Sequence, residues 1–255
     1  NGEIYVGSQS TPQILRISSD MPPAATPQSV VNAASNVPGL VAGSAATVYL
    51  AGALASPGIN SASSVPLPTA IGGLSVMVGG QPAPLYATAF VNGLEQINFQ
   101  VPFEAAGTEV PVVIRRGSAE SAPVMVPLLP AQPGIFANGQ DGILVFNSDF
   151  SLVTPANPAS AGMDVVFYAT GLGPVTNAPP TGAPAPREPL AQTIETPSVT
   201  LGGVPCQVQF AGLAPDFIGV YQVNFRVPQG VPPGMAELVV TSGGVASPPV
   251  RVAIK

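Results

Sequence analysis

The sequence lacks several residue types on which common functional sites depend. Its 255 residues include no His, no Trp and a single Cys, Cys206. Without His, a Ser-His-Asp or Cys-His catalytic group is impossible, and so is a zinc site with His ligands. One Cys can form neither an intramolecular disulfide nor a cysteine zinc site. We therefore expect no disulfide framework, no metal ion and no cofactor.

Charged residues are also scarce, at 8% of the chain, against about 25% in a typical soluble domain. Seven basic residues face 13 acidic ones, which gives a net charge of -6. This balance argues against nucleic-acid binding, which needs clustered Lys and Arg. The acidic residues are scattered and the only Lys is Lys255, so the sequence shows no pattern for paired-carboxylate or Ser-Lys catalysis. We expect no enzyme activity.

Proline and glycine are abundant, with 32 and 28 residues, and they leave few windows long enough for a long helix. Hydrophobic residues make up 46% of the chain, which favours a folded protein over a disordered one. Short runs rich in Val and Ile between Gly- and Pro-containing turns predict an all-β protein. The uncharged segment 39–59 is interrupted by Gly and Pro, so we expect strand and loop there and no membrane span.

The chain contains an internal repeat. SVMVGGQPAPL from Ser75 corresponds to SVTLGGVPCQV from Ser198, and QINFQVP from Gln96 corresponds to QVNFRVP from Gln222. The separation of equivalent residues changes only in small steps along the chain, which indicates one duplicated unit with short loop insertions.

Each unit has about 100 residues, the size of an immunoglobulin-like sandwich. Alternation of apolar and polar residues predicts about seven short strands per unit; 74–78 and 198–201, for example, each run into a Gly-Gly turn. We therefore predict two tandem immunoglobulin-like β-sandwiches. The predicted divisions are an N-terminal extension over 1–29, a first domain over 30–128, a linker over 129–141 and a second domain over 142–255.

Motifs in the second unit, GGVPC from Gly202 and QVNFRVP from Gln222, resemble those of IPT/TIG-type immunoglobulin-like domains. More closely, the chain resembles the paired C-terminal module of secreted Solibacter and other acidobacterial proteins. This resemblance implies two immunoglobulin-like sandwiches and export from the cell, and it assigns no activity. The matching segments are VVNAAS from Val30, PLP from Pro66, INFQVPFEA from Ile97, PGIF from Pro133, ATGLGPV from Ala169 and FAGLAP from Phe210.

The pattern of apolar and polar residues in the N-terminal extension predicts two strands, Ile4–Gly7 and Gln13–Ser18. It resembles the edge of a β-propeller blade, and the chain begins with Asn1 rather than Met. One interpretation is therefore the remnant of a larger protein. The other is a free strand, the donor strand, that docks on a second subunit. In that case its subunit interface would consist of Ile4, Tyr5, Val6, Ile14, Leu15 and Ile17.

No charged residue occurs between Asp20 and Glu95. The first domain should therefore expose a weakly polar surface suited to burial against neighbours, although an Ala-rich lineage would explain the same gap. We predict an extracellular structural protein at the cell surface. It would self-associate as a homopolymer into a filament or surface array, by head-to-tail β-strand addition of its N-terminal segment.

The alternative is a non-catalytic adhesin or carbohydrate-binding accessory module at the C-terminus of a larger secreted protein. Loops Asn60–Val65 and Asn177–Arg187 would then form the site, because they lie at the same point of each repeat. Their few aromatic and polar side chains count against a sugar platform. Contact with a surface glycan or the cell envelope stays open.

Overall fold

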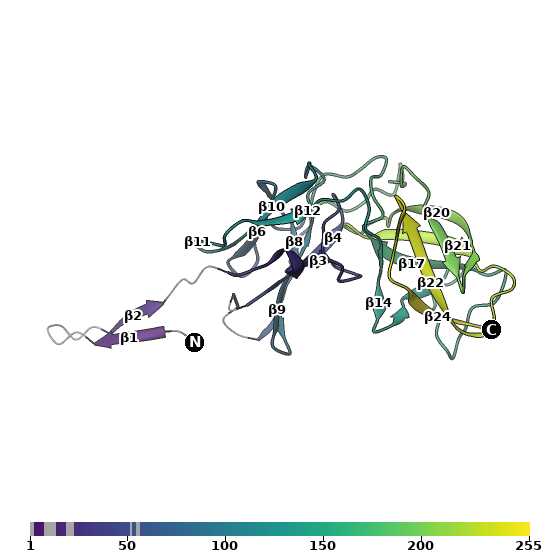
Figure 1. The fold of residues 1–255 in the computed structure, drawn as a ribbon, viewed down its shortest axis with the longest axis horizontal. Coiled ribbons are helices and arrows are strands. Elements are labelled where there is room, and N and C mark those ends of the chain that lie inside the picture. Colours follow the sequence, from purple (N-terminus) through teal and green to yellow (C-terminus); the bar gives the residue numbers. More distant parts are fainter. Residues whose placement is uncertain (1–2, 8–13, 19–22, 52, 55–56) are drawn as a thin grey trace.

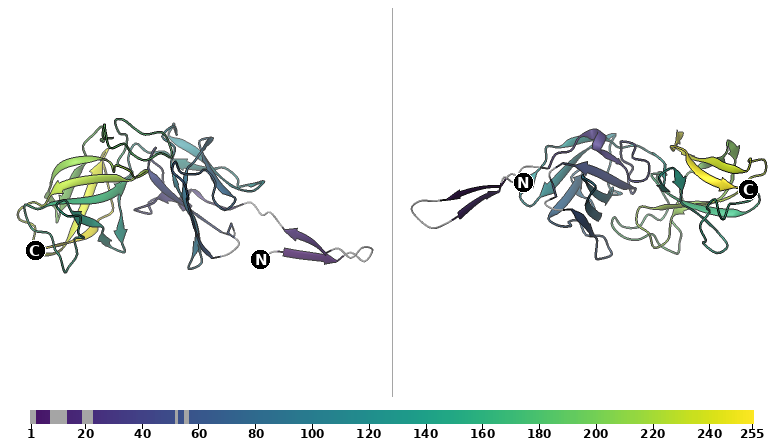
Figure 2. Two further views of the ribbon diagram at one scale, coloured as in Figure 1. Left: turned by 180° about the vertical axis from the view of Figure 1, so that it is seen from behind. Right: turned by 90° about the horizontal axis from the view of Figure 1, so that it is seen from below.

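A computed structural model describes residues 3–7, 14–18, 23–51, 53–54 and 57–255. Nearly all regular structure is antiparallel β-sheet, which confirms the predicted all-β class. Two sandwiches lie next to each other along the long axis of the molecule (Figure 1), and views from behind and below agree (Figure 2). Within the described residues the helical structure is η1, a three-residue 3-10 turn at Pro27–Ser29, and no helix there is long and apolar enough to cross a membrane.

The first sandwich packs two five-stranded sheets. One sheet has the order β3-β4-β9-β8-β5. The other has the order β11-β10-β6-β7, and β12 also pairs with β10. The strands are β3 (Val30–Asn32), β4 (Ala45–Leu50), β5 (Gly58–Ser61), β6 (Leu74–Val78), β7 (Gln81–Pro82), β8 (Leu85–Val91), β9 (Leu94–Gln100), β10 (Glu109–Arg116), β11 (Ala119–Glu120) and β12 (Val124–Pro127).

The second sandwich packs a five-stranded sheet on a seven-stranded one. The smaller sheet has the order β13-β17-β21-β20 with β16 beside β17; the larger has the order β14-β15-β24-β22-β18-β19 with β23 beside β22. The strands are β13 (Gly134–Ile135), β14 (Ala137–Asn138), β15 (Asp141–Gly142), β16 (Leu144–Phe146), β17 (Asp164–Thr170), β18 (Ser198–Leu201), β19 (Val204–Pro205), β20 (Gln207–Leu213), β21 (Tyr221–Arg226), β22 (Gly234–Ser242), β23 (Val245–Ala246) and β24 (Val250–Ile254).

Each sandwich has its own apolar core between its two sheets. Ile97 and Phe99 of β9 are fully buried in the first core, and Phe167 and Phe225 occupy the second with ring centroids 5.9 Å apart. Successive side chains of a strand point to opposite faces, so the residues between these core positions lie on the outer face of each sheet. Each sandwich therefore has a separate hydrophobic core.

The repeat is visible in the strand register. The pairing of β8 with β9 shifts by one residue between Leu85 and Ala87, and the pairing of β20 with β21 shifts between Val208 and Phe210. These two irregularities occupy equivalent places in the repeat. Outward-facing residues of the two sandwiches can thus be compared position by position.

The N-terminal residues form a hairpin. β1 (Glu3–Gly7) pairs antiparallel with β2 (Ile14–Ser18), and the hairpin lies apart from both sandwiches (Figure 1). All six residues of the predicted subunit interface fall within these strands, and their role in assembly stays a prediction. Gln13, predicted to begin the second strand, lies outside the described residues.

Candidate binding surfaces at the domain junction

Buried polar contacts join the two sandwiches. The backbone N–H of Ala45 donates to Thr170 Oγ1 at 2.8 Å, and the Thr170 hydroxyl donates to the carbonyl oxygen of Gly219 at 2.9 Å. Gln100 Oε1 accepts from the backbone N–H of Gly182 at 2.7 Å. Thr170 and Gln100 are fully buried. Because unpaired buried polar groups destabilise a fold, these bonds hold the two domains in one arrangement.

Tyr86 and Gly219 form a close contact across the junction. The Tyr86 hydroxyl of the first domain donates to the carbonyl oxygen of Ile218 in the second at 2.8 Å. Burial raises the pKa of Tyr86 far above its usual value, so this hydroxyl stays a donor. Gly219 has a φ of 63°, and a Cβ there would lie only 2.6 Å from Tyr86 Oη. Glycine is therefore required by both backbone conformation and space.

The predicted linker is itself bound to both domains. The Asn32 side-chain amide donates to the carbonyl oxygen of Gln132 at 2.8 Å, and the backbone N–H of Gln132 donates to the carbonyl oxygen of Gly171 at 2.9 Å. The Gln132 side-chain amide donates to the carbonyl oxygen of Pro38 at 2.6 Å. The linker thus adds to the stiffness of the junction.

The two loops predicted as a ligand site lie in different surroundings, and their role in binding stays a prediction. Thr181, in the loop Asn177–Arg187, accepts from the backbone N–H of Phe103 at 3.0 Å and donates to Glu104 at 2.7 Å, so this loop packs on the first domain. In the loop Asn60–Val65, the first two residues belong to edge strand β5. The second loop is therefore part of the domain junction.

A groove lies where the outer face of β4 and β9 meets the second domain. Its volume is about 380 Å³. Tyr49 and Gln96 face each other across β4 and β9, and Phe136 and Val220 of the second domain form one wall. None of its lining residues is charged: Ala33, Asn36, Ala45, Thr47, Tyr49, Tyr86, Gln96, Asn98, Phe136 and Val220.

Part of the hydrogen-bonding capacity of this groove is unused. The Thr47 hydroxyl donates to Asn98 Oδ1 at 2.8 Å, and the Tyr49 hydroxyl donates to Asn36 Oδ1 at 2.9 Å. Within the described chain, Asn98 Nδ2 and the side-chain amide of Gln96 have no hydrogen-bond partner. Both side chains are half-buried, so these amides can reach a molecule that enters the groove.

On the equivalent face of the second sandwich, the side-chain amides donate to one another within that domain. Tyr168 pairs with Gln222 across β17 and β21, as Tyr49 pairs with Gln96 in the first sandwich. Gln222 donates to Asn224 Oδ1 at 2.8 Å, and Asn224 Nδ2 donates to Asn147 Oδ1 at 3.3 Å. The ring of Tyr168 lies 6.0 Å from a neighbouring ring, that of Phe217. The repeat therefore places one residue pattern in two environments, open at the junction and closed on the second domain.

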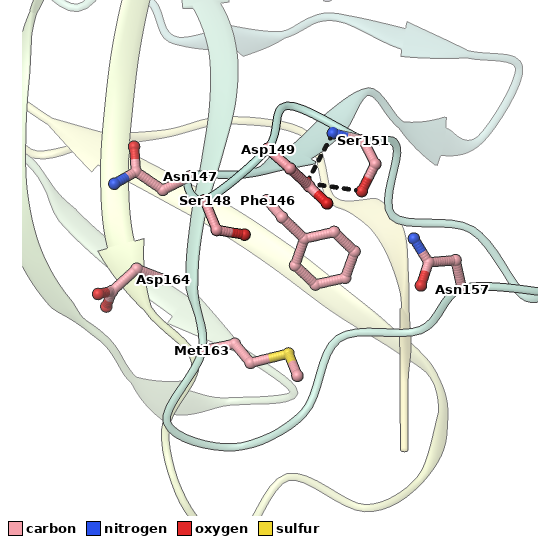
Figure 3. A pocket seen from close by; sticks show the side chains of 8 residues that line it. All are labelled: Phe146, Asn147, Ser148, Asp149, Ser151, Asn157, Met163 and Asp164. Carbon is pink, nitrogen blue, oxygen red and sulfur yellow. Dashed lines mark hydrogen bonds between the residues drawn. The ribbon is translucent and has the colours of Figure 1, made fainter.

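A second hollow, of about 450 Å³, lies on the second sandwich (Figure 3). Asp149 accepts from the backbone N–H and the hydroxyl of Ser151 at 3.0 and 2.8 Å, and these bonds lower its pKa. Asp164 pairs with Arg226 at 2.8 Å, which lowers the pKa of Asp164. Both carboxylates are therefore engaged. Across the described ranges no three potential metal ligands cluster.

No known protein family and no curated protein matches the sequence. The chain is similar to SGBP-B of the Bacteroides ovatus mixed-linkage glucan utilization locus, solved with a mixed-linkage heptasaccharide, at 12% identity and a TM-score of 0.31 over 85% of this chain and 42% of that one. It thus spans less than half the length of that protein.

Two further solved structures are similar. The S-layer protein SbsC, domains 5–6, matches at 14% identity and a TM-score of 0.25, covering 91% of this chain and 98% of that one. The tandem Ig repeats of Dlar match at 13% and a TM-score of 0.22, covering 92% and 98%. The predicted pair of tandem β-sandwiches is confirmed by the sheet topology, whereas the resemblance to IPT/TIG-type and acidobacterial modules stays a prediction.

Proposed function

We propose that this chain is an extracellular, non-catalytic structural subunit that assembles head to tail into a filament or surface array. The observation that carries the proposal is a sheet edge in the first sandwich, formed by β5, that no strand of the described residues covers. All four residues of β5 are exposed, and none is charged or Pro. Proteins commonly protect such edges with charges, Pro or a covering segment, because a free edge pairs with other chains.

The open side of β5 can be assigned from its hydrogen bonds. β5 pairs with β8 on one side, and no strand of the described residues pairs with its other side. The backbone N–H of Ala62, just after β5, donates to the carbonyl oxygen of Tyr86 at 2.8 Å. Backbone groups alternate in direction along a strand. Those of Ile59 and Ser61 therefore point to the open side.

In this proposal the N-terminal hairpin supplies the strand that adds to this edge. β1 and β2 pair with each other, and no other strand of the described residues pairs with the second edge of either. Addition of either strand to β5 of another subunit would extend the sheet through backbone hydrogen bonds. Donor and acceptor are different surfaces of the chain, so the contact does not close on itself and propagates as a polymer.

Ser61→Pro tests the acceptor edge. The exchange removes the outward N–H of residue 61 and leaves the pairing of β5 with β8, because Pro is tolerated on the free side of an edge strand. We expect Ser61→Pro to remain monomeric in sedimentation velocity and Ser61→Ala, which keeps the N–H, to polymerise like the parent chain. Polymers of unchanged size in Ser61→Pro would exclude β5 as the acceptor.

The location is tested separately by antibody labelling of cells that produce the protein. Labelling of intact cells is expected. Labelling only after the cells are made permeable would contradict an extracellular role.

A further inference from the structure

We propose that the groove between β4, β9 and the second domain is a binding site for a neutral saccharide. Binding at this groove would be a role separate from the structural one and would not require polymerisation. No lining residue carries a charge, so the groove offers no opposite charge to a phosphate, a carboxylate or an ammonium group and favours a neutral ligand.

The open amides supply the hydrogen bonds that such a ligand needs. Gln96 and Asn98 lie two residues apart on β9, so their side chains share a face and stand roughly 7 Å from each other along the strand. Each amide group can both donate and accept, which suits hydroxyl groups that do the same. In this groove the two amides can hold hydroxyls of adjacent sugar rings.

Aromatic and apolar surfaces complete the site. The half-buried ring of Tyr49 lies opposite Gln96 on the neighbouring strand, with its hydroxyl held by Asn36. Such a ring presents an apolar face to the C–H groups of a sugar and a polar tip to its hydroxyls. Phe136 and Val220 close the groove from the second domain. Because the junction is fixed by buried hydrogen bonds, the walls are in place before a ligand arrives, which lowers the cost of binding.

The second sandwich provides a matched control within the same chain. Its equivalent residues, Tyr168, Gln222 and Asn224, are engaged with other side chains of their own domain. A property of the sheet alone would give both faces the same binding. If the ligand binds at the first face alone, the open amides of Gln96 and Asn98 and the wall from the second domain are the cause.

The test uses saturation-transfer NMR on the full chain. The neutral probes are cellohexaose and maltohexaose, and an oligogalacturonate of similar length is the acidic counterpart. We expect transfer to at least one neutral oligosaccharide and none to the acidic one. Absence of transfer to both neutral probes, or equal transfer to the acidic one, overturns the proposal.

Substitutions then locate the site. Gln96→Ala and Asn98→Ala should each raise the dissociation constant of the oligosaccharide about ten-fold. This is the expected effect of losing one hydrogen bond between the side-chain amide and a sugar hydroxyl. The controls Gln222→Ala and Asn224→Ala should bind like the parent chain. Gln96→Glu, which keeps the side-chain size, is a second variant if truncation disturbs the fold. Equal weakening by both sets, or no weakening by the first, overturns the assignment.

Discussion

Thr170 Oγ1 accepts a hydrogen bond from the backbone N–H of Ala45 at 2.8 Å, and both residues are buried between the two sandwiches. The same hydroxyl donates to Gly219, so one side chain links the first domain to a loop of the second. A junction of this kind resists bending between the domains.

Thr170→Val should lower the free energy of unfolding by about 1–3 kcal/mol, because it leaves a buried N–H and a buried carbonyl oxygen without their partner. Urea denaturation followed by circular dichroism measures the change. Thr69→Val is the control, since Thr69 is exposed. The urea concentration at the unfolding midpoint of this variant should equal that of the parent chain within error. Equal midpoints for both variants would contradict a stabilising junction.

Gly219→Ala should open the junction, because the added Cβ would lie 2.6 Å from Tyr86 Oη. The control is Gly203→Ala, since Gly203 also has a positive φ, 78°, but a Cβ there meets nothing within 4 Å. Both variants strain the backbone, and only the first crowds the neighbouring domain. Small-angle X-ray scattering should show a larger maximum dimension for Gly219→Ala alone. Identical scattering of the two variants would remove the steric argument.

Acid should destabilise the second sandwich through Asp149 and Asp164. Hydrogen bonds from Ser151 lower the pKa of Asp149, and those from Arg226 lower the pKa of Asp164. A carboxyl group with a lowered folded-state pKa stabilises the fold above its unfolded pKa, and this contribution is lost as the pH falls through the folded value. The melting temperature should therefore fall below a pH of about 3.8, the ordinary Asp value. Asp164→Asn should flatten that fall; an unchanged pH profile would contradict the assignment.

Cys206 should react slowly with thiol reagents at pH 8. Burial raises the pKa of its thiol to about 11, so little of the reactive thiolate is present at that pH. The rate of labelling by a chromogenic disulfide should rise steeply between pH 9 and about 11. The urea-unfolded chain, in which burial is lost, should react faster at pH 8. Equal rates for the folded and unfolded chains would show that the thiol is not protected.

The strands with strict alternation were predictable from the sequence. Leu74–Val78 is a strand with the predicted bounds, because its buried and half-buried residues alternate and a Gly-Gly turn follows. Strand β5 was missed, since Gly-Ile-Asn-Ser has no such pattern and pairs only because β8 lies beside it.

The junction and its groove could not be predicted either. The groove needs Phe136 and Val220 next to Tyr49, and this proximity results from how two domains pack. The repeat did hold one signal: Tyr49 with Gln96 and Tyr168 with Gln222 occupy equivalent positions. The repeat could not show that the loop Asn177–Arg187 binds the first domain, because those hydrogen bonds form between units.

Assembly through the N-terminal segment can be seen by negative-stain electron microscopy. The purified chain 1–255 is compared at neutral pH with a chain that lacks residues 1–19; the buried core residues that the structure describes lie at Val30 and beyond, and circular dichroism checks that the shortened chain is folded. We predict regular fibres for the full chain and dispersed two-lobed particles for the shortened one. Dispersed particles for the full chain at high concentration, or fibres that persist after the truncation, would contradict it.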